Sequence, residues 1–114
     1  MAYTKNFVQA KNQSLRTYDS SGGDSTFQAV GNPLDEPGRL VKFKNDTDVD
    51  ISISYDGINT HDIILAGDRE VEELCTNKTV EGGLLRPANT QIYASSAAGT
   101  GNLYITVIHA EGNK

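Results

Sequence analysis

The sequence has one cysteine, Cys75, no tryptophan and three prolines among its 114 residues. A single cysteine excludes an intrachain disulfide, so packing and strand pairing must hold the fold together. No stretch approaches the roughly 18 consecutive apolar residues of a membrane helix, and the N-terminus lacks the apolar core of a secretory signal. We therefore expect a protein that is made in a cytoplasm and has no membrane partner.

Basic residues are also few. The 10 Lys and Arg residues stand against 15 Asp and Glu residues, which gives a formal net charge of -5. No Lys/Arg cluster is long enough to follow a phosphate backbone, so the sequence predicts no nucleic-acid partner. The negative charge favours solubility and neutral or basic protein surfaces, but it does not identify a partner.

Two features are abundant: glycine, with 11 residues, and an alternation of apolar and polar residues from Arg39 to His109. Val41 and Phe43 alternate with lysines, and a second alternating run extends from Val49 to Tyr55. A period of two is typical of strands with one buried face, and glycines supply tight turns. The pattern predicts an all-β fold, a small antiparallel β-sandwich or jelly roll of about 7–8 strands.

Some elements can be placed more closely. Asn45 to Asp48 is expected to form a turn, and Asp56-Gly57 suits the positive φ angles of a type I′ hairpin turn. Arg69 to Thr76 carries three glutamates and is expected to be an exposed edge strand. Leu103 to His109 is apolar or aromatic on both faces, which is typical of a central strand. Within that strand Val107 is assigned to the core.

The first 38 residues are less periodic, and we divide the chain into an extended N-terminal arm, residues 1–38, and a β-sandwich domain, residues 39–114. Thr26 to Val30 is a possible short strand within the arm. The arm cannot bury enough apolar area alone, so we expect it to pair with the sandwich or with another chain, and removal of residues 1–24 to leave the domain folded. The residues predicted to anchor it on a partner are Tyr3, Phe7, Leu15, Tyr18 and Phe27.

The candidate chemical motifs are incomplete. Asp46, Asp48 and Asp50 resemble the start of a calcium loop, but Ile51 stands where such loops need glycine and Gly57 where they need glutamate. The pair His61-Asp62 and the second imidazole, His109, have no serine in a nucleophile elbow, and no motif surrounds Cys75. We therefore predict no enzyme activity, no cofactor and no metal.

Several phrases carry a family resemblance: Ile51–Gly57, His61–Gly67, Thr76–Lys78, Thr90–Tyr93 and Gly101–Ile108. From about Arg39 to His109 the chain resembles the short jelly-roll decoration proteins, also called cement or staple proteins, on the capsids of podophages. The resemblance implies a virion structural protein on the capsid exterior, made in the host cytoplasm. It would bind the phage major capsid protein as a homo-oligomer, a dimer or trimer, and stabilise the head.

Two alternatives remain open at this point. A head-to-tail connector or tail protein of the same virion would also use a small β-sandwich with an extended arm. A carbohydrate-binding module would use Tyr55, Tyr93 and Tyr104, and would need these rings coplanar on one exposed sheet face. Cross-strand tyrosine pairs also stabilise sheets without any ligand.

Overall fold

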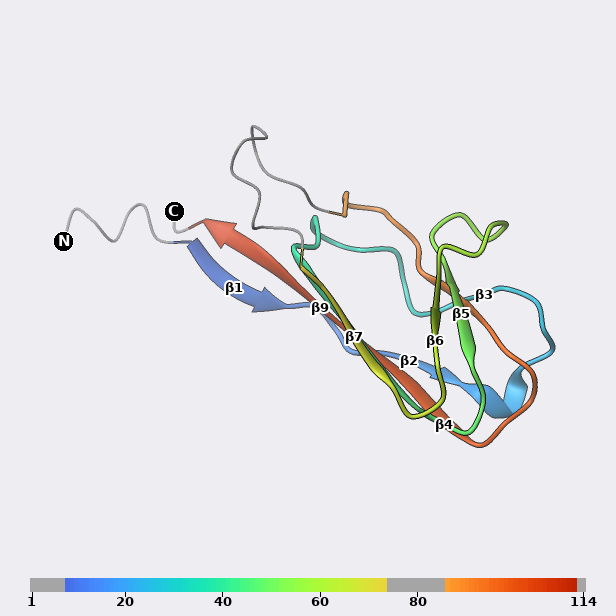
Figure 1. The fold of residues 1–114 in the computed structure, drawn as a ribbon. Coiled ribbons are helices and arrows are strands. Elements are labelled where there is room, and N and C mark those ends of the chain that lie inside the picture. The colour runs from blue at the N-terminus through green and yellow to red at the C-terminus, as the bar shows by residue number, and fades with distance from the viewer. Residues whose placement is uncertain (1–7, 74–85, 113–114) are drawn as a thin grey trace, which may run out of the picture.

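The computed structural model describes residues 8–73 and 86–112, with side chains described for 11–73 and 86–109. The chain folds into a β-sandwich of two antiparallel sheets, which confirms the predicted fold class (Figure 1). Tyr3, Phe7 and Cys75 lie outside the described residues. The elements are β1 (Val8–Asn12), β2 (Arg16–Asp19), the 3-10 helix η2 (Ser20–Gly22), β3 (Gln28–Ala29), β4 (Leu40–Thr47), β5 (Ile51–Ser54), β6 (Asp62–Ile64), β7 (Arg69–Glu73), β8 (Tyr93–Ser95) and β9 (Gly101–Gly112).

The strands are connected as in a jelly roll. One sheet has the order β1-β9-β4-β7, with β2 also pairing with β9, and the other has the order β3-β8-β5-β6. Thus β2 pairs with β9, β3 with β8, β4 with β7, and β5 with β6. This nested pairing of early with late strands gives the two four-stranded sheets of a jelly roll, to which β1 is added beside β9.

The predicted strong strand is the centre of the five-stranded sheet. β9 pairs with β1 and β2 on one side and with β4 on the other. Its residues Leu103, Ile105 and Val107 are fully buried, whereas Tyr104 and Thr106 between them face away from the core and are half-buried. The expectation of a central strand is therefore confirmed.

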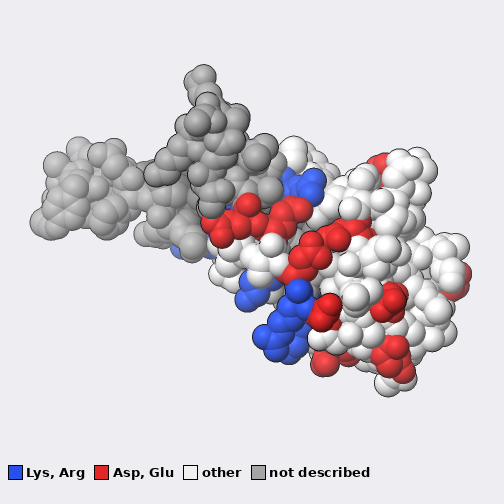
Figure 2. Space-filling view, viewed as in Figure 1, with Lys and Arg blue, Asp and Glu red and all other residues white. Residues whose placement is uncertain are grey.

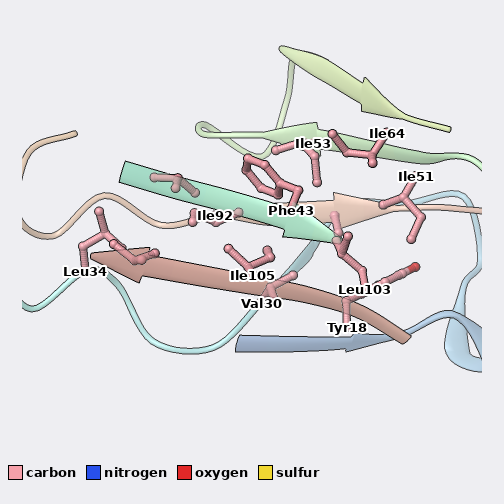
Figure 3. Close-up of a cluster of buried hydrophobic side chains, with 13 residues drawn as sticks. Tyr18, Val30, Leu34, Phe43, Ile51, Ile53, Ile64, Ile92, Leu103 and Ile105 are labelled. Carbon is pink, nitrogen blue, oxygen red and sulfur yellow. The ribbon is translucent and has the colours of Figure 1, made fainter. Parts of the chain in front are cut away.

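The core lies between the two sheets, where inward-facing residues of both interdigitate (Figure 3). Phe43 on β4 and Ile105 on β9 are cross-strand neighbours in one sheet, and Ile53 on β5 comes from the other. Alternation in β4 is complete from Val41 to Thr47, as expected for a strand with one buried face. The buried apolar residues are Tyr18, Val30, Leu34, Val41, Phe43, Ile51, Ile53, Ile64, Ile92, Ala94, Leu103, Ile105 and Val107.

The described part of the predicted arm belongs to the sandwich. Residues 8–38 contribute β1 and β2 to one sheet and β3 to the other, and β3 lies within the short strand expected near Phe27. Tyr18 on β2 is 4% exposed, and its hydroxyl is 2.9 Å from the hydroxyl of Ser96. A buried ring with a satisfied hydroxyl stabilises this chain's own core.

The turn predicted at Asn45 to Asp48 is wrong, because β4 continues to Thr47. Asn45 is buried, and its side-chain amide donates to the carbonyls of Val49, Ile64 and Leu65 at 2.9, 2.9 and 3.2 Å. Its side-chain oxygen accepts from the backbone N–H and hydroxyl of Thr47. The amide thus satisfies backbone carbonyls of the β4–β5 connection, of the end of β6 and of the β6–β7 connection, which explains a polar residue at a core position.

Replacement of Val107 by Asp tests the core. The new carboxylate would lie unpaired in the centre of β9, which should cost several kcal/mol, a large part of the stability of a domain this size. We expect the variant to lose its cooperative thermal transition, measured by circular dichroism. Thr17→Asp, at an exposed position on the adjacent strand β2, is the matched control and should melt close to wild type. Equal melting of both variants would contradict the assignment.

Deletion of residues 1–24 should now unfold the protein, contrary to the expectation from sequence. The deletion removes β1, β2 and Tyr18, so β9 loses its neighbours along one side. Deletion of residues 1–7 leaves every described strand in place and should retain the cooperative transition. Calorimetry of the two truncated proteins decides between the expectations. A cooperative transition of the 25–114 fragment would show that the sandwich folds without residues 1–24.

Candidate interaction surface

The two strands β6 and β7 end their respective sheets, and each pairs on one side only with another described strand. They follow each other in the chain through the turn at residues 65–68, so one segment supplies an edge to both sheets (Figure 1). An unpaired edge presents backbone N–H and C=O groups to which another chain can add. The free sides of β6 and β7 are therefore candidate sites for a partner chain.

Exposed apolar side chains gather in this same part of the chain. Among the described residues five large hydrophobic side chains are exposed, and four of them lie between residues 58 and 71. They are Ile58 at 80%, Ile63 and Leu65 at 53%, and Val71 at 56%. Ile63 points away from the core because its neighbour Ile64 is buried. We call Ile58, Ile63 and Leu65, together with the free side of β6, the β6 edge surface.

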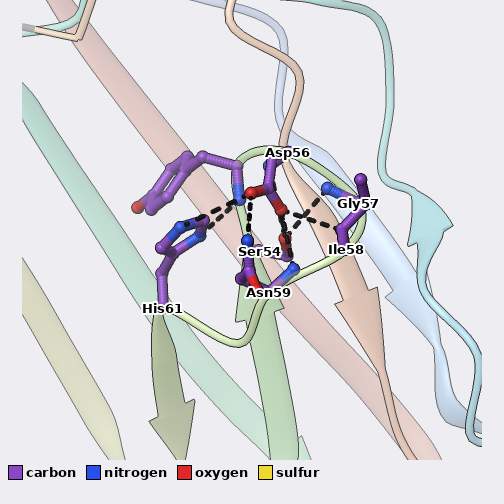
Figure 4. A network of polar contacts seen from close by, with 7 residues as sticks. Ser54, Asp56, Gly57, Ile58, Asn59 and His61 are labelled. Carbon is purple, nitrogen blue, oxygen red and sulfur yellow. Dashed lines mark hydrogen bonds and ion pairs between the residues drawn. The ribbon is translucent and has the colours of Figure 1, made fainter.

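The loop before β6 is held by an aspartate (Figure 4). The carboxylate of Asp56 accepts from the backbone N–H groups of Ile58 and Asn59, both at 2.8 Å, and from the Ser54 hydroxyl at 2.9 Å. These hydrogen bonds, first those from the backbone, lower the pKa of Asp56 well below its usual range. Ile58 is thus presented on an ordered loop rather than on a loose one.

The predicted type I′ turn at Asp56-Gly57 is wrong. β5 ends at Ser54 and β6 begins at Asp62, so the connection is longer than a two-residue turn. Gly57 has the positive φ of 76°, but Asp56 is not among the described residues with positive φ. Its side chain makes the turn instead, by accepting the N–H groups two and three residues ahead.

His61 has a structural role in this loop. Its Nδ1 accepts from the backbone N–H of Tyr55 at 3.0 Å, and its Nε2 lies 3.9 Å from Oδ2 of Asp56. The imidazole and the Tyr55 ring are 5.7 Å apart between centroids. The pair His61-Asp62 that was considered from sequence therefore has its imidazole engaged with residues of its own loop.

A charged pair closes the sandwich between the two sheets. Arg86 binds the carboxylate of Glu72 on β7 through two hydrogen bonds, of 2.7 and 2.8 Å. Its guanidinium carbon lies 3.8 Å from the centroid of the Tyr55 ring, which follows β5 of the opposite sheet. Burial, together with the charge of Glu72, raises the pKa of Tyr55 to about 12, so the phenol stays neutral. These contacts seal the apolar interior behind β6 and β7.

Beside this pair, two carboxyl groups meet across the same gap. Glu70 on β7 shares a hydrogen bond with Asp62 on β6, and this bond with partial burial and the Asp62 charge raises the pKa of Glu70 to about 7. Near neutral pH the pair holds a proton for part of the time. The contact joins the two edge strands, but it loses strength when both groups ionise.

The residues predicted to anchor the arm have different surroundings. Leu15 is 59% exposed in the connection between β1 and β2, Tyr18 is buried in the core, and Phe27 is half-buried just before β3. Tyr3 and Phe7 are outside the described residues. Of the three described residues, only Leu15 presents most of its side chain to solvent, and the burial of Tyr18 removes it from any anchoring surface.

The three tyrosines considered for sugar binding do not share a platform. Tyr104 faces outward from the five-stranded sheet, opposite Lys44. Tyr93 lies in the other sheet, and its ring packs against Gly57 so closely that a Cβ at that position would lie 3.2–3.4 Å from the ring carbons. Tyr55 is covered by Arg86. This arrangement lacks the coplanar rings that a sugar-binding face requires.

Sequence reasoning missed the β6 edge surface, although one signal was present. The run Asp62-Ile-Ile-Leu65 places three apolar residues in succession, and a strand cannot turn all three toward one core. At least one side chain must face outward. Ile63 and Leu65 do so, while Ile64 is buried.

No family model and no curated sequence matches the chain. Within the described residues no group of three or more His, Cys, Asp or Glu side chains is placed to hold a metal ion. The same part of the chain contains no helix that is long and apolar enough to cross a membrane.

The shared proton of Glu70 predicts a pH dependence of stability. Because the folded state raises this pKa to about 7, the stabilisation is complete below the pKa of the unfolded chain and is lost as pH rises through about 7. Glu70→Gln keeps a hydrogen bond to Asp62 without ionising. We expect this variant to have the melting temperature of wild type at about pH 5 and a higher melting temperature than wild type at about pH 8.

Glu73→Gln is the control for this experiment, because it removes one carboxylate from an exposed position of the same strand. It should shift the melting temperature much less between the two pH values. Parallel curves for wild type and Glu70→Gln across this range would show that Glu70 and Asp62 do not share a proton.

Proposed function

We propose that the protein is a virion structural protein, a capsid decoration protein that binds the major capsid protein lattice and stabilises the phage head. It acts on the capsid exterior after synthesis in the host cytoplasm, as a homo-oligomer, a dimer or trimer. The proposal is supported by the resemblance of Arg39 to His109 to podophage decoration proteins. The observation that carries it is the β6 edge surface.

The geometry of that surface suits a repeated lattice. Exposed apolar side chains and unpaired strand edges give a modest contact at each site, through burial of apolar area and addition of main-chain hydrogen bonds. An oligomer that touches several capsid subunits converts such contacts into avidity, because the later contacts form at high effective concentration. A small domain can therefore bind a lattice firmly through a limited interface.

The fold supports the proposal by analogy. Jelly rolls occur in viral capsid and lectin domains, among others, and the same fold carries unrelated functions. What favours assembly over sugar binding here is the placement of the tyrosines in different sheets and of the exposed aliphatic residues on the edge.

The test is the copy number of the protein in purified particles of the source phage, by quantitative mass spectrometry against the major capsid protein. A decoration protein should be present at a number comparable with that of the capsid protein. A number lower by an order of magnitude or more would indicate a connector or tail protein, and absence from particles would refute a virion role.

The interface is tested by adding purified variants to particles that lack the protein. The double variant Ile63→Asp, Leu65→Asp should reduce occupancy at least tenfold, because it places two charges where apolar contact is expected. Leu15→Asp is the matched control, since Leu15 is similarly exposed but lies between β1 and β2. Both variants should keep the wild-type melting temperature. Loss of binding with Leu15→Asp alone would move the interface to the N-terminal segment.

A further inference from the structure

A second surface, on the outer face of the five-stranded sheet, has the opposite character. A groove of about 410 Å³ crosses β4, β7 and β9 there. Its positive side chains are Lys42 and Lys44 from β4 and Arg69 from β7, and Val71 and Tyr104 supply apolar surface between them. Figure 2 shows Lys and Arg side chains gathered on one flank of the molecule next to a band of Asp and Glu. We call this site the basic groove.

The register places like charges directly across from each other. Lys44 on β4 is paired with Arg69 on β7, and on its other side it faces Tyr104 on β9. Like charges opposite each other destabilise a sheet. Among the described residues neither side chain forms a salt bridge, nor does Lys42. The chain has a net charge of -5, yet it keeps three cations together in a groove where Glu70 is the acidic residue that lines the wall beside them.

The spacing of the cations matches an extended peptide. Lys42 and Lys44 are two residues apart on one strand, a separation of about 6.6–6.8 Å, which is the distance between alternate side chains of any extended chain. A carboxylate between Lys44 and Arg69 would relieve their repulsion, and a guanidinium binds carboxylates through two parallel hydrogen bonds. A second carboxylate two residues along would reach Lys42.

We propose that the basic groove binds an extended acidic segment of a partner protein, with carboxylates at alternate positions and the intervening side chains directed away from the sheet. The proposal uses a different face from the β6 edge surface and does not depend on a role in virions. Thr106 also lines the groove and offers a hydroxyl group.

The surroundings favour a short acidic segment over a nucleic acid. Glu70 borders the groove, with its carboxyl hydrogen-bonded to Asp62, and Glu73 is exposed on the same face of β7 as Arg69 and Val71. A long polyanion that leaves the groove on this side would meet these carboxylates and a protein of net negative charge. A peptide needs acidic residues only where it contacts the three cations.

The probe is a fluorescein-labelled peptide, Thr-Glu-Thr-Glu-Thr-Glu-Thr, and the measurement is fluorescence anisotropy with the full chain at low ionic strength. We expect saturable binding that weakens as salt is added, because the attraction between exposed charges is screened. The same peptide with Gln in place of Glu should bind at least tenfold more weakly. Equal binding of the two peptides would overturn the proposal.

Lys44→Glu should reduce affinity for the acidic peptide at least tenfold, and it should not lower the melting temperature, because it replaces a like-charged pair with an opposite-charged one. Lys11→Glu is the control, since Lys11 is exposed on β1 and the change in net charge is the same. It should alter affinity less than twofold. Equal weakening by both variants would show that overall charge, rather than the groove, attracts the peptide.

Two further outcomes would also overturn the proposal. One is the absence of binding up to millimolar peptide. The other is tighter binding of a single-stranded oligonucleotide of equal charge, displaced by Lys44→Glu, which would assign the groove to another class of partner. Amide chemical-shift changes on peptide addition should concentrate at residues 42–44, 69–71 and 104–106.

Discussion

The position of β9 is the constraint on which the rest of the structure depends. This strand pairs with β1 and β2 from the N-terminal part of the described chain on one side, and with β4 on the other. Its buried residues Leu103, Ile105 and Val107 form one wall of the core. Because the other pairs nest inside the β2–β9 pair, both sheets and the edge positions of β6 and β7 follow from it. The surfaces proposed for binding are therefore consequences of where β9 lies.

The sandwich is closed by polar contacts at places where strand pairing stops. Asn45 satisfies carbonyls beside β5 and β6 from within the core, and Arg86 joins Glu72 to the Tyr55 ring across the two sheets. Unsatisfied polar groups at such depth would cost more than the hydrogen bonds themselves contribute. These contacts let β6 and β7 remain free edges without opening the interior to water.

Alternation predicted β4 and β5, because each has one buried face that its own sequence shows, and apolar residues on both faces predicted β9 as a central strand. It could not predict β1 and β2, whose residues Lys11, Asn12 and Thr17 are polar and which become strands by pairing with β9. Nor could it predict a buried Arg16, whose guanidinium donates to the carbonyls of Ser14 and Asn32. The basic groove was equally hidden, because Arg69 is far in sequence from the two lysines and only the β4–β7 register brings them together.

β7 connects the two proposed surfaces through its pleat. Arg69 and Val71 face the basic groove, whereas Glu70 and Glu72 face the gap between the sheets, where they contact Asp62 and Arg86. The groove attracts a partner through electrostatic forces, which are long-range and are screened by salt. The β6 edge surface contributes through burial of apolar area, which requires direct contact. A protein partner that spans β7 would meet both in a fixed register. The charges would then set its orientation and speed its approach, and the apolar contacts would hold it in place.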